Sequence, residues 1–343
     1  MKKLKLDLDG VLYEGDVNEV VTAPVPPPPV VRTYTVVAGD DLIKIGRKVN
    51  LDWKMIASLN NIVAPYIIFP KQVLILPEAM PVPTPIEQPK YVMLNAINWR
   101  PEGLSNLPYA DTSEITYFVI EVDNRGNLLF INSSQEEEFI KNVLASGKKV
   151  TLSIGGGSQD TNDISSAVIN YGSAFAQRLA GYIHMAGYSG VWLDIENTSI
   201  PPDAINAFIS ILRYQLDTFS VGLSIGIYVQ PYQLNTVWSN LGDIADRFSR
   251  LSAMIYDAGP FNFDTFKRQT LEWLPRIGNN RSKLLIGAAV NYPIQDGGLT
   301  PEQYAQVLDF VNEEKLGGAA LWNNALFSEP WRVIQRQKFP KLY

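Results

Sequence analysis

The chain has 343 residues, of which 46% are hydrophobic, with no cysteine and a single histidine, His184. The missing cysteines exclude disulfides, thiol nucleophiles and iron–sulfur clusters, and one histidine cannot build a multi-histidine metal site. With 29 basic and 35 acidic residues the formal charge is −6, which argues against nucleic acid or anionic lipid as partners. We therefore expect chemistry based on carboxylates, hydroxyls, amides and aromatic rings, with neutral glycans as possible partners.

The amino terminus, MKKLKLDLDG, lacks the continuous apolar stretch of a secretory signal. No run of eighteen uncharged apolar residues follows, so we expect no membrane span. Alternation of Leu4, Leu6 and Leu8 fits either a short strand that adds to the sheet edge of another protein or a frayed tail.

Proline-rich stretches around residues 24–29 and 77–89 divide the chain. Proline fixes φ and has no N–H, so both stretches should be extended spacers between separate modules. The predicted organisation is therefore an amino-terminal arm and linker over residues 1–31, a small module over 32–78, a second linker over 79–89 and a large module over 90–343.

The small module has the pattern of an α+β unit in the order strand, helix, helix, strand. Strands are expected at residues 34–37 and 73–76, and helices at 42–49 and 51–59, with Asp40 or Asp41 as the cap of the first helix. So short a chain must use its apolar positions economically.

The spaced positions of this module resemble a LysM domain: Tyr34, Val36, Gly39, Asp40, Leu42, Ile45, Leu59, Asn60, Ile62, Ile68, Gln72 and the closing Ile75-Leu76-Pro77. The resemblance implies binding of N-acetylglucosamine-containing chains, peptidoglycan or chitin. Asp41, Gly46 and Lys71 depart from the usual pattern, and the alternative is a LysM-like module used for protein assembly.

The large module contains eight apolar runs that read as strands, separated by amphipathic segments. The strands are expected at 91–97, 115–121, 149–154, 190–195, 221–228, 251–256, 284–290 and 318–322, and helices at 135–145, 171–186, 202–219, 263–276 and 301–315. Continuous hydrophobicity indicates strands buried on both faces, as in a parallel sheet. The size and rhythm predict an α/β fold, a closed (β/α)8 TIM barrel. An open doubly wound sheet is the alternative, and no glycine-rich dinucleotide motif follows the first strand.

In such a barrel the chemistry lies at the carboxyl ends of the strands. The sharpest feature there is Trp192-Leu193-Asp194-Ile195-Glu196. Because side chains alternate along a strand, Asp194 and Glu196 should share one face at the barrel mouth. Two close carboxylates raise the proton affinity of at least one of them, which suits a general acid.

Aromatic side chains end two later strands, Tyr256 the sixth and Trp322 the eighth. A hydroxyl donor and an indole beside a carboxylic acid are what a sugar ring needs while its glycosidic bond is cleaved. A single carboxylate at a strand end, such as Glu121, is more simply a helix cap or an ion-pair partner, and Tyr256 and Trp322 could also be core residues.

These residues resemble the family 18 glycoside hydrolases, the chitinase and hevamine group with its bacterial cell-wall relatives, over residues 90–343. The resemblance rests on Ser153-Ile154-Gly155-Gly156, on the final Asp194-x-Glu196 of the family signature, on Met254-Ile255-Tyr256-Asp257 and on Trp322. Ser189 and Trp192 replace two signature aspartates. Trp192 points the same way as Asp194, so a polar partner of Asp194 is lost, and weakened activity is expected.

The resemblance implies retaining, substrate-assisted hydrolysis of β-1,4 linkages in N-acetylglucosamine-containing polymers, without metal or cofactor. Glu196 would be the general acid and base, Asp194 would orient the substrate acetamido group and Tyr256 would hydrogen-bond its carbonyl. Asp257, Trp322, Gly155 and Gly156 would bind substrate. His184 precedes the fourth strand, away from the barrel mouth, and is expected to be structural.

Two alternatives to a chitinase-like or N-acetylglucosaminidase-like enzyme are kept. One is a non-catalytic glycan-binding protein that retains the barrel as a lectin. The other, compatible with the enzyme, is a structural component of a phage tail or contractile injection particle whose proteins bind residues 1–78. The lack of a signal peptide motivates it, because the polymer lies at the cell wall or outside the producing cell. A lysozyme-type barrel of family 25 is a weaker rival.

Overall fold

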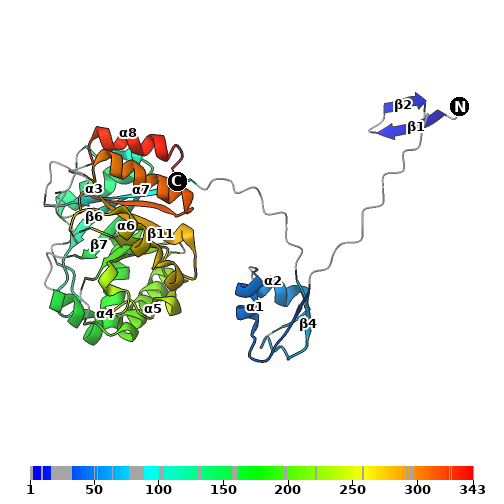
Figure 1. Ribbon diagram of the computed structural model, residues 1–343, viewed down its shortest axis with the longest axis horizontal. Coiled ribbons are helices and arrows are strands. Elements are labelled where there is room, and N and C mark those ends of the chain that lie inside the picture. Colours follow the sequence, from blue (N-terminus) through cyan, green and yellow to red (C-terminus); the bar gives the residue numbers. More distant parts are fainter. Residues whose placement is uncertain are drawn as a thin grey trace. The chain divides into compact units, whose positions relative to one another are not determined.

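The computed structural model describes two compact units, residues 1–87 and 88–343. The described residues are 3–8, 11–16, 33–49, 51, 53–63, 65–76, 89–99, 104, 106–129, 131, 133–156, 161–196, 199–220, 222–256, 259–290, 293, 297–323, 325 and 327–342. Figure 1 labels the helices and strands of each unit. Within the described residues, no helix combines the length and the apolar character that crossing a bilayer would require.

The first unit contains a hairpin and the small βααβ module. Strands β1 (Lys3–Leu8) and β2 (Val11–Asp16) pair antiparallel within the chain. The predicted short strand therefore exists and has a partner in its own chain. The module follows as β3 (Thr33–Thr35), α1 (Leu42–Val49), α2 (Trp53–Leu59) and β4 (Val73–Ile75), with β3 and β4 antiparallel.

A small apolar core and one asparagine hold the βααβ module together. Ile45, Ile56 and Leu74 are fully buried between the helices and the two-stranded sheet. The Asn60 side chain donates to the carbonyl oxygens of Ile56 and Ile75 and accepts from the Ile75 N–H at 2.7 Å. Asp41 caps α1 by accepting from the Lys44 N–H at 2.7 Å, as one of the two predicted caps.

The second unit is a closed barrel of eight parallel strands, which confirms the predicted TIM barrel. The strands are β5 (Tyr91–Ile97), β6 (Glu114–Ile120), β7 (Lys149–Gly155), β8 (Gly190–Asp194), β9 (Ser224–Val229), β10 (Arg250–Met254), β11 (Leu284–Ala289) and β12 (Gly318–Trp322). They pair in sequence order, and β12 closes onto β5. Most of their residues are fully buried, which explains the continuous hydrophobic runs.

The helices that surround the barrel are α3 (Ser134–Ala145), α4 (Thr161–Ala186), α5 (Pro202–Phe219), α6 (Phe263–Leu271), α7 (Pro301–Glu313) and α8 (Glu329–Lys338). Local sequence explains where several begin. Ser133 caps α3 by accepting from the Glu136 N–H, and Thr300 forms a capping box with Gln303 ahead of Pro301 in α7. In the described residues the connections after β5 and β9 contain 3-10 turns instead of an α-helix.

The helix boundaries differ from the sequence predictions in three places. Helix α4 begins at Thr161, whereas the sequence predicts a start at 171. The prediction starts too late because the first turns of α4 carry asparagine and serine, which are weak helix formers in isolation. The segment predicted as one helix over 263–276 is α6 followed by a 3-10 turn at Leu274–Ile277. Helix α8 was not predicted, since its apolar positions are few, yet Trp331 is buried against the barrel.

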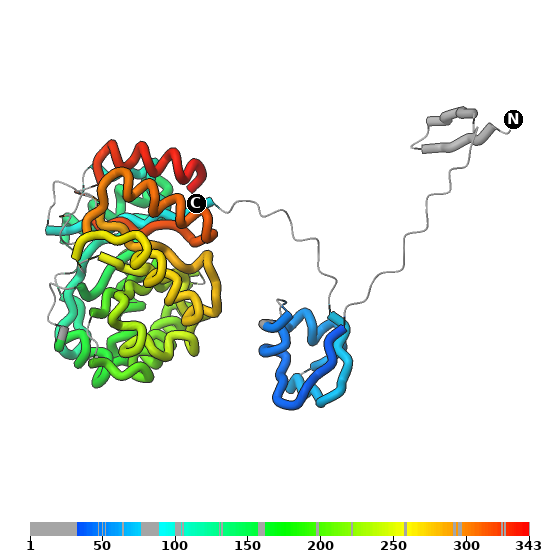
Figure 2. Tube along the Cα trace, in the orientation of Figure 1, coloured from blue at the N-terminus to red at the C-terminus, as the bar shows by residue number. Residues whose placement is uncertain are grey.

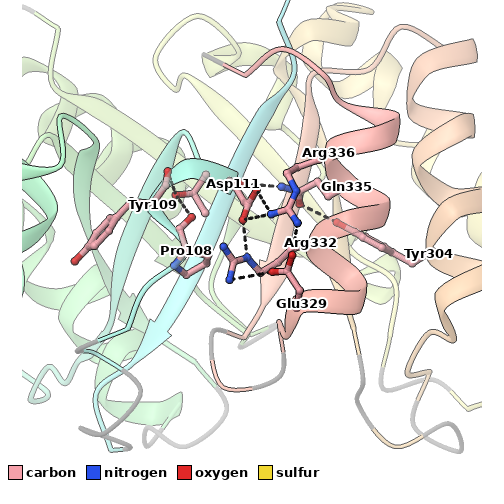
Figure 3. A network of polar contacts seen from close by, with 9 residues as sticks. Pro108, Tyr109, Asp111, Tyr304, Glu329, Arg332, Gln335 and Arg336 are labelled. Atoms are coloured by element: carbon pink, nitrogen blue, oxygen red, sulfur yellow. Dashed lines mark hydrogen bonds and ion pairs between the residues drawn. The ribbon is translucent and has the colours of Figure 1, made fainter.

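A buried aspartate fastens the last helix to the start of the barrel. Asp111, fully buried in the 3-10 turn Tyr109–Asp111, accepts from Arg332 Nε at 2.5 Å and from Arg336 at 3.0 Å (Figure 3). Gln335 donates to the Asp111 carbonyl and accepts from the Tyr304 hydroxyl at 3.0 Å. Helices α7 and α8 accordingly lie side by side (Figures 1 and 2).

Replacing Asp111 by alanine should lower the free energy of unfolding of the barrel by about 3 kcal/mol, because two arginines lose a desolvated partner. The measurement is urea unfolding followed by circular dichroism. Asp309→Asn is the matched control, since Asp309 of α7 pairs with Lys338, which lies on α8 like the two arginines, but is half exposed. This substitution should lower the free energy of unfolding by less than about 1 kcal/mol. Equal effects of the two substitutions would contradict this role of Asp111.

Candidate active site

Two carboxylates meet where β8 ends. Asp194 is the last residue of β8 and is 5% exposed, while Glu196 lies two positions further and is half-buried. The intervening Ile195 packs in the outer hydrophobic layer, as alternation along the strand requires. The Gln233 side chain donates to the Ile195 carbonyl at 2.7 Å and holds the backbone between the two carboxylates.

The carboxyl of Asp194 is in an environment that disfavours its charge. Burial raises the pKa of Asp194 well above its ordinary value, and the neighbouring negative charge of Glu196 adds to this effect. Its Oδ1 has no hydrogen-bond partner among the described residues. Asp194 therefore keeps its proton to a higher pH than an ordinary aspartate, next to a second carboxylate at the barrel mouth.

Gly155 and Gly156 form a close support for Asp194. The Gly156 N–H donates to the Asp194 carbonyl at 2.8 Å. A Cβ at Gly155 would lie 2.1 Å from that carbonyl oxygen, and one at Gly156 would lie 3.3 Å from Asp194 Oδ2. Both glycines also have positive φ, of 91° and 103°. They were predicted as substrate-binding residues, and in the structure both lie against Asp194, with Phe118 also beside Gly156.

Tyrosines lie beside the carboxylate pair on the next strands. Tyr228, on β9, donates from its hydroxyl to Asn95 Oδ1 at 2.5 Å, and burial with the nearby charge of Asp194 raises its pKa. Tyr256 follows β10, is half-buried and packs against the inner aromatic cluster that contains Tyr228 and Trp192. Tyr256 and Asp194 both act electrostatically on Tyr228, which is thus a common neighbour of the two. Asp257 lies outside the described residues.

An aromatic wall stands at the end of β12. The Trp322 ring packs edge-on against Phe118, with centroids 4.8 Å apart, and Trp99 lies 6.4 Å from Trp322. Trp99 is 52% exposed, unlike the buried core aromatics. Sequence reasoning missed Trp99, although its place two residues after the first barrel strand could have indicated it. The exposed Trp99 ring next to Trp322 extends the aromatic surface at this end of the barrel.

Trp192 occupies the position of the missing signature aspartate and points into the barrel. Its indole N–H donates to Glu114 Oε1 at 2.5 Å, away from Asp194. Ser153, its neighbour in the β7–β8 register, is buried and has no partner for its hydroxyl among the described residues. Ser189 contributes only its backbone to the described hydrogen bonds. His184 stacks on Phe219 at the far end of α4, in keeping with a structural role.

Comparison with known proteins agrees with both units. Residues 34–77 match the LysM domain model. No curated protein sequence matches the chain. The described architecture is that of a LysM domain followed by a barrel similar to chitinases and to the spore enzyme SleL.

The solved structures that resemble the chain share its fold at low sequence identity. The spore cortex-lytic enzyme SleL of Bacillus megaterium is 14% identical with a TM-score of 0.60, and the match covers 91% of this chain and 87% of that one. The chitinase of Chromobacterium violaceum is 13% identical with a TM-score of 0.61, covering 73% and 98%. The GH18 chitinase ChiB of Flavobacterium johnsoniae is 16% identical with a TM-score of 0.62, covering 73% and 94%.

Asp194→Asn should stabilise the barrel at neutral pH. The pKa of Asp194 is higher in the folded protein than its ordinary value of 3.8. The protonated carboxyl therefore contributes fully to the free energy of unfolding below pH 3.8, and this contribution is lost as the pH rises through the raised pKa. The variant should therefore gain about 1 kcal/mol or more at pH 7.5 and little at pH 4. Thermal unfolding across this range measures the difference.

The control for this substitution is Asp264→Asn, which neutralises an exposed aspartate at the start of α6 and should change stability by less than about 0.5 kcal/mol at either pH. If Asp194→Asn were less stable than the wild type at pH 7.5, the carboxyl would be stabilised as an anion, contrary to this description of the site.

Proposed function

We propose that the barrel hydrolyses β-1,4 linkages in N-acetylglucosamine-containing polymers with retention of configuration. The observation that carries the proposal is the pair formed by buried Asp194 and half-buried Glu196 where β8 ends, in a barrel that also carries the aromatic wall of Trp322 and Trp99 at the carboxyl ends of β12 and β5. A protonated carboxyl beside a second carboxylate supplies acid catalysis, and exposed indole rings supply a surface for sugars.

In the proposed reaction, Glu196 receives the proton held by Asp194 and donates it to the glycosidic oxygen as the bond to the leaving sugar breaks. The carbonyl oxygen of the substrate's own acetamido group attacks the anomeric carbon and forms an oxazolinium ion. Asp194 accepts the acetamido N–H and orients the group, while the Tyr256 hydroxyl donates to its carbonyl oxygen. Glu196 then removes a proton from water, and the resulting hydroxide opens the ion, which regenerates the acid.

The proposed substrate is peptidoglycan or chitin. The LysM match at residues 34–77 supports it, because one chain would then combine a glycan-binding module with a glycan-cleaving barrel. The similarity to SleL, described as a spore cortex-lytic enzyme, favours peptidoglycan, and the similarity to chitinases favours chitin. The proposed site of action is the cell wall or another polymer outside the producing cell.

Glu196→Gln should reduce the release of reducing sugar from purified peptidoglycan and chitin by at least about 100-fold, because the amide cannot donate an acidic proton. Sedimentation with the insoluble polymer should be unchanged. Products are identified by mass spectrometry.

The matched control is Glu121→Gln, which neutralises an exposed carboxylate just after β6 and should retain wild-type activity. Hydrolysis by Glu196→Gln at the wild-type rate would overturn the assignment of the general acid.

A second candidate is a glycan-binding barrel without hydrolysis. It is favoured by Trp192, which leaves Ser153 Oγ and Asp194 Oδ1 without hydrogen-bond partners in the described part of the barrel. Polymer binding with no soluble product from the wild-type chain, even after long incubation, would select this candidate.

A further inference from the structure

A buried carboxylate that the proposed chemistry does not use lies deeper in the barrel. Glu114 begins β6 and is 2% exposed. It accepts from Thr151 Oγ1 at 2.8 Å, from Trp192 Nε1 at 2.5 Å and from the Tyr91 hydroxyl. These donors come from β7, β8 and β5, so Glu114 joins four strands through its side chain.

Positive charge lies next to this carboxylate. A cavity of 210 Å³ is lined by Glu114, Trp192, Lys149 and Arg250, among others, at the amino-terminal end of the strands. The Arg250 guanidinium lies 3.5 Å from the centroid of the Tyr91 ring. Two cations beside the carboxylate favour a strong hydrogen-bond acceptor at this point of the barrel.

The indole of Trp192 is held in one orientation between its neighbours. On one side its N–H is bound to Glu114, and on another its ring packs 4.9 Å from Tyr228. Gly226 leaves room for the ring, because a Cβ there would lie 2.3 Å from Trp192 Cδ2. Rotation of the ring that moved the N–H elsewhere would therefore lose a charge-assisted hydrogen bond.

This orientation determines what lies beneath the carboxylate pair. Residues 192 and 194 share the inward face of β8, so the indole fills the barrel under Asp194. The side of the ring that carries its only polar group is turned away toward Glu114. The unpartnered Ser153 Oγ and Asp194 Oδ1 show that the ring offers neither of them a hydrogen bond.

We propose that Glu114 is a positioning residue for the carboxylate pair, acting through Trp192. By holding the indole N–H, Glu114 withholds a donor from Asp194 and leaves Glu196 as the group with which Asp194 exchanges its proton. The proposal rests on the proposed function, in which that proton serves the general acid.

The ionisable groups near Asp194 in the described part of the chain come from several strands. Glu196 acts on Asp194 directly, and Asp194 in turn acts on Tyr228 of β9. Tyr256 and Glu114 also act on Tyr228. A test must therefore separate the hydrogen bond to Trp192 from the simple removal of the Glu114 charge.

The test is a titration of Asp194 by carbon-13 NMR of the aspartate carboxyls in the full chain, with its signal identified by its loss in Asp194→Asn. In Glu114→Leu the freed indole can donate to Asp194, which favours the carboxylate, and the titration midpoint should fall by about one pH unit. Glu114→Gln removes the charge but keeps an acceptor for the indole, so its midpoint should stay at the wild-type value.

A second substitution asks whether the effect passes through the indole. Trp192→Phe has no N–H, so adding it to Glu114→Leu should return the Asp194 midpoint to the wild-type value, and alone it should leave the midpoint unchanged. No shift in folded Glu114→Leu, or an equal shift in Glu114→Gln, would overturn the proposal. If Glu114→Leu does not fold, a shifted midpoint in Trp192→Phe alone would overturn it.

The titration needs no substrate, so it is independent of the proposed function. A wild-type chain that cleaves no glycan would refute hydrolysis while leaving the midpoints measurable. Conversely, if the wild-type chain cleaves glycan but the Asp194 titration midpoint is the same in Glu114→Leu as in the wild type, only the positioning role is refuted.

Discussion

The desolvation of one carboxyl at the end of β8 is the constraint on which the site depends. Asp194 is buried against a closed barrel and close to Glu196, and both conditions favour its protonated form. Such a carboxyl destabilises the fold at neutral pH, so its retention needs a reason outside stability. The proposed acid catalysis by the adjacent glutamate is a reason that fits the geometry.

The surrounding barrel serves that carboxyl in two ways. Gly155, at the end of β7, lets the backbone approach the Asp194 carbonyl, from whose oxygen a Cβ would lie only 2.1 Å away. Two residues before Asp194 on β8, the Trp192 ring takes the place of the signature aspartate that would be a polar partner of Asp194. Glu114 accepts the indole N–H and keeps it turned away from Asp194. The mouth is then completed by exposed Trp99 beside Trp322.

Much of this architecture could be predicted from local sequence. Continuous apolar runs located the eight strands, because a parallel barrel buries both faces of each strand. Alternation predicted that Asp194 and Glu196 share one face, and in the structure the charge of Glu196 acts on Asp194. The βααβ order of the small module followed equally from its spacing.

What could not be predicted depends on contacts between residues distant in sequence. The bond between Trp192 and Glu114 joins positions 78 apart, and Asp111 meets Arg332 across 221 residues. Helix α8 owes its stability to such contacts rather than to its own composition. The sequence likewise carried no sign that the two connections after β5 and β9 would lack an α-helix in the described residues.

The central claim is that the substrate's own acetamido group is the nucleophile and Glu196 the acid. The most direct measurement is proton NMR of the anomer first released from N-acetylglucosamine oligomers, recorded before mutarotation. The mechanism predicts that the β-anomer appears first, because two inversions at the anomeric carbon give net retention. An initial excess of the α-anomer would contradict it.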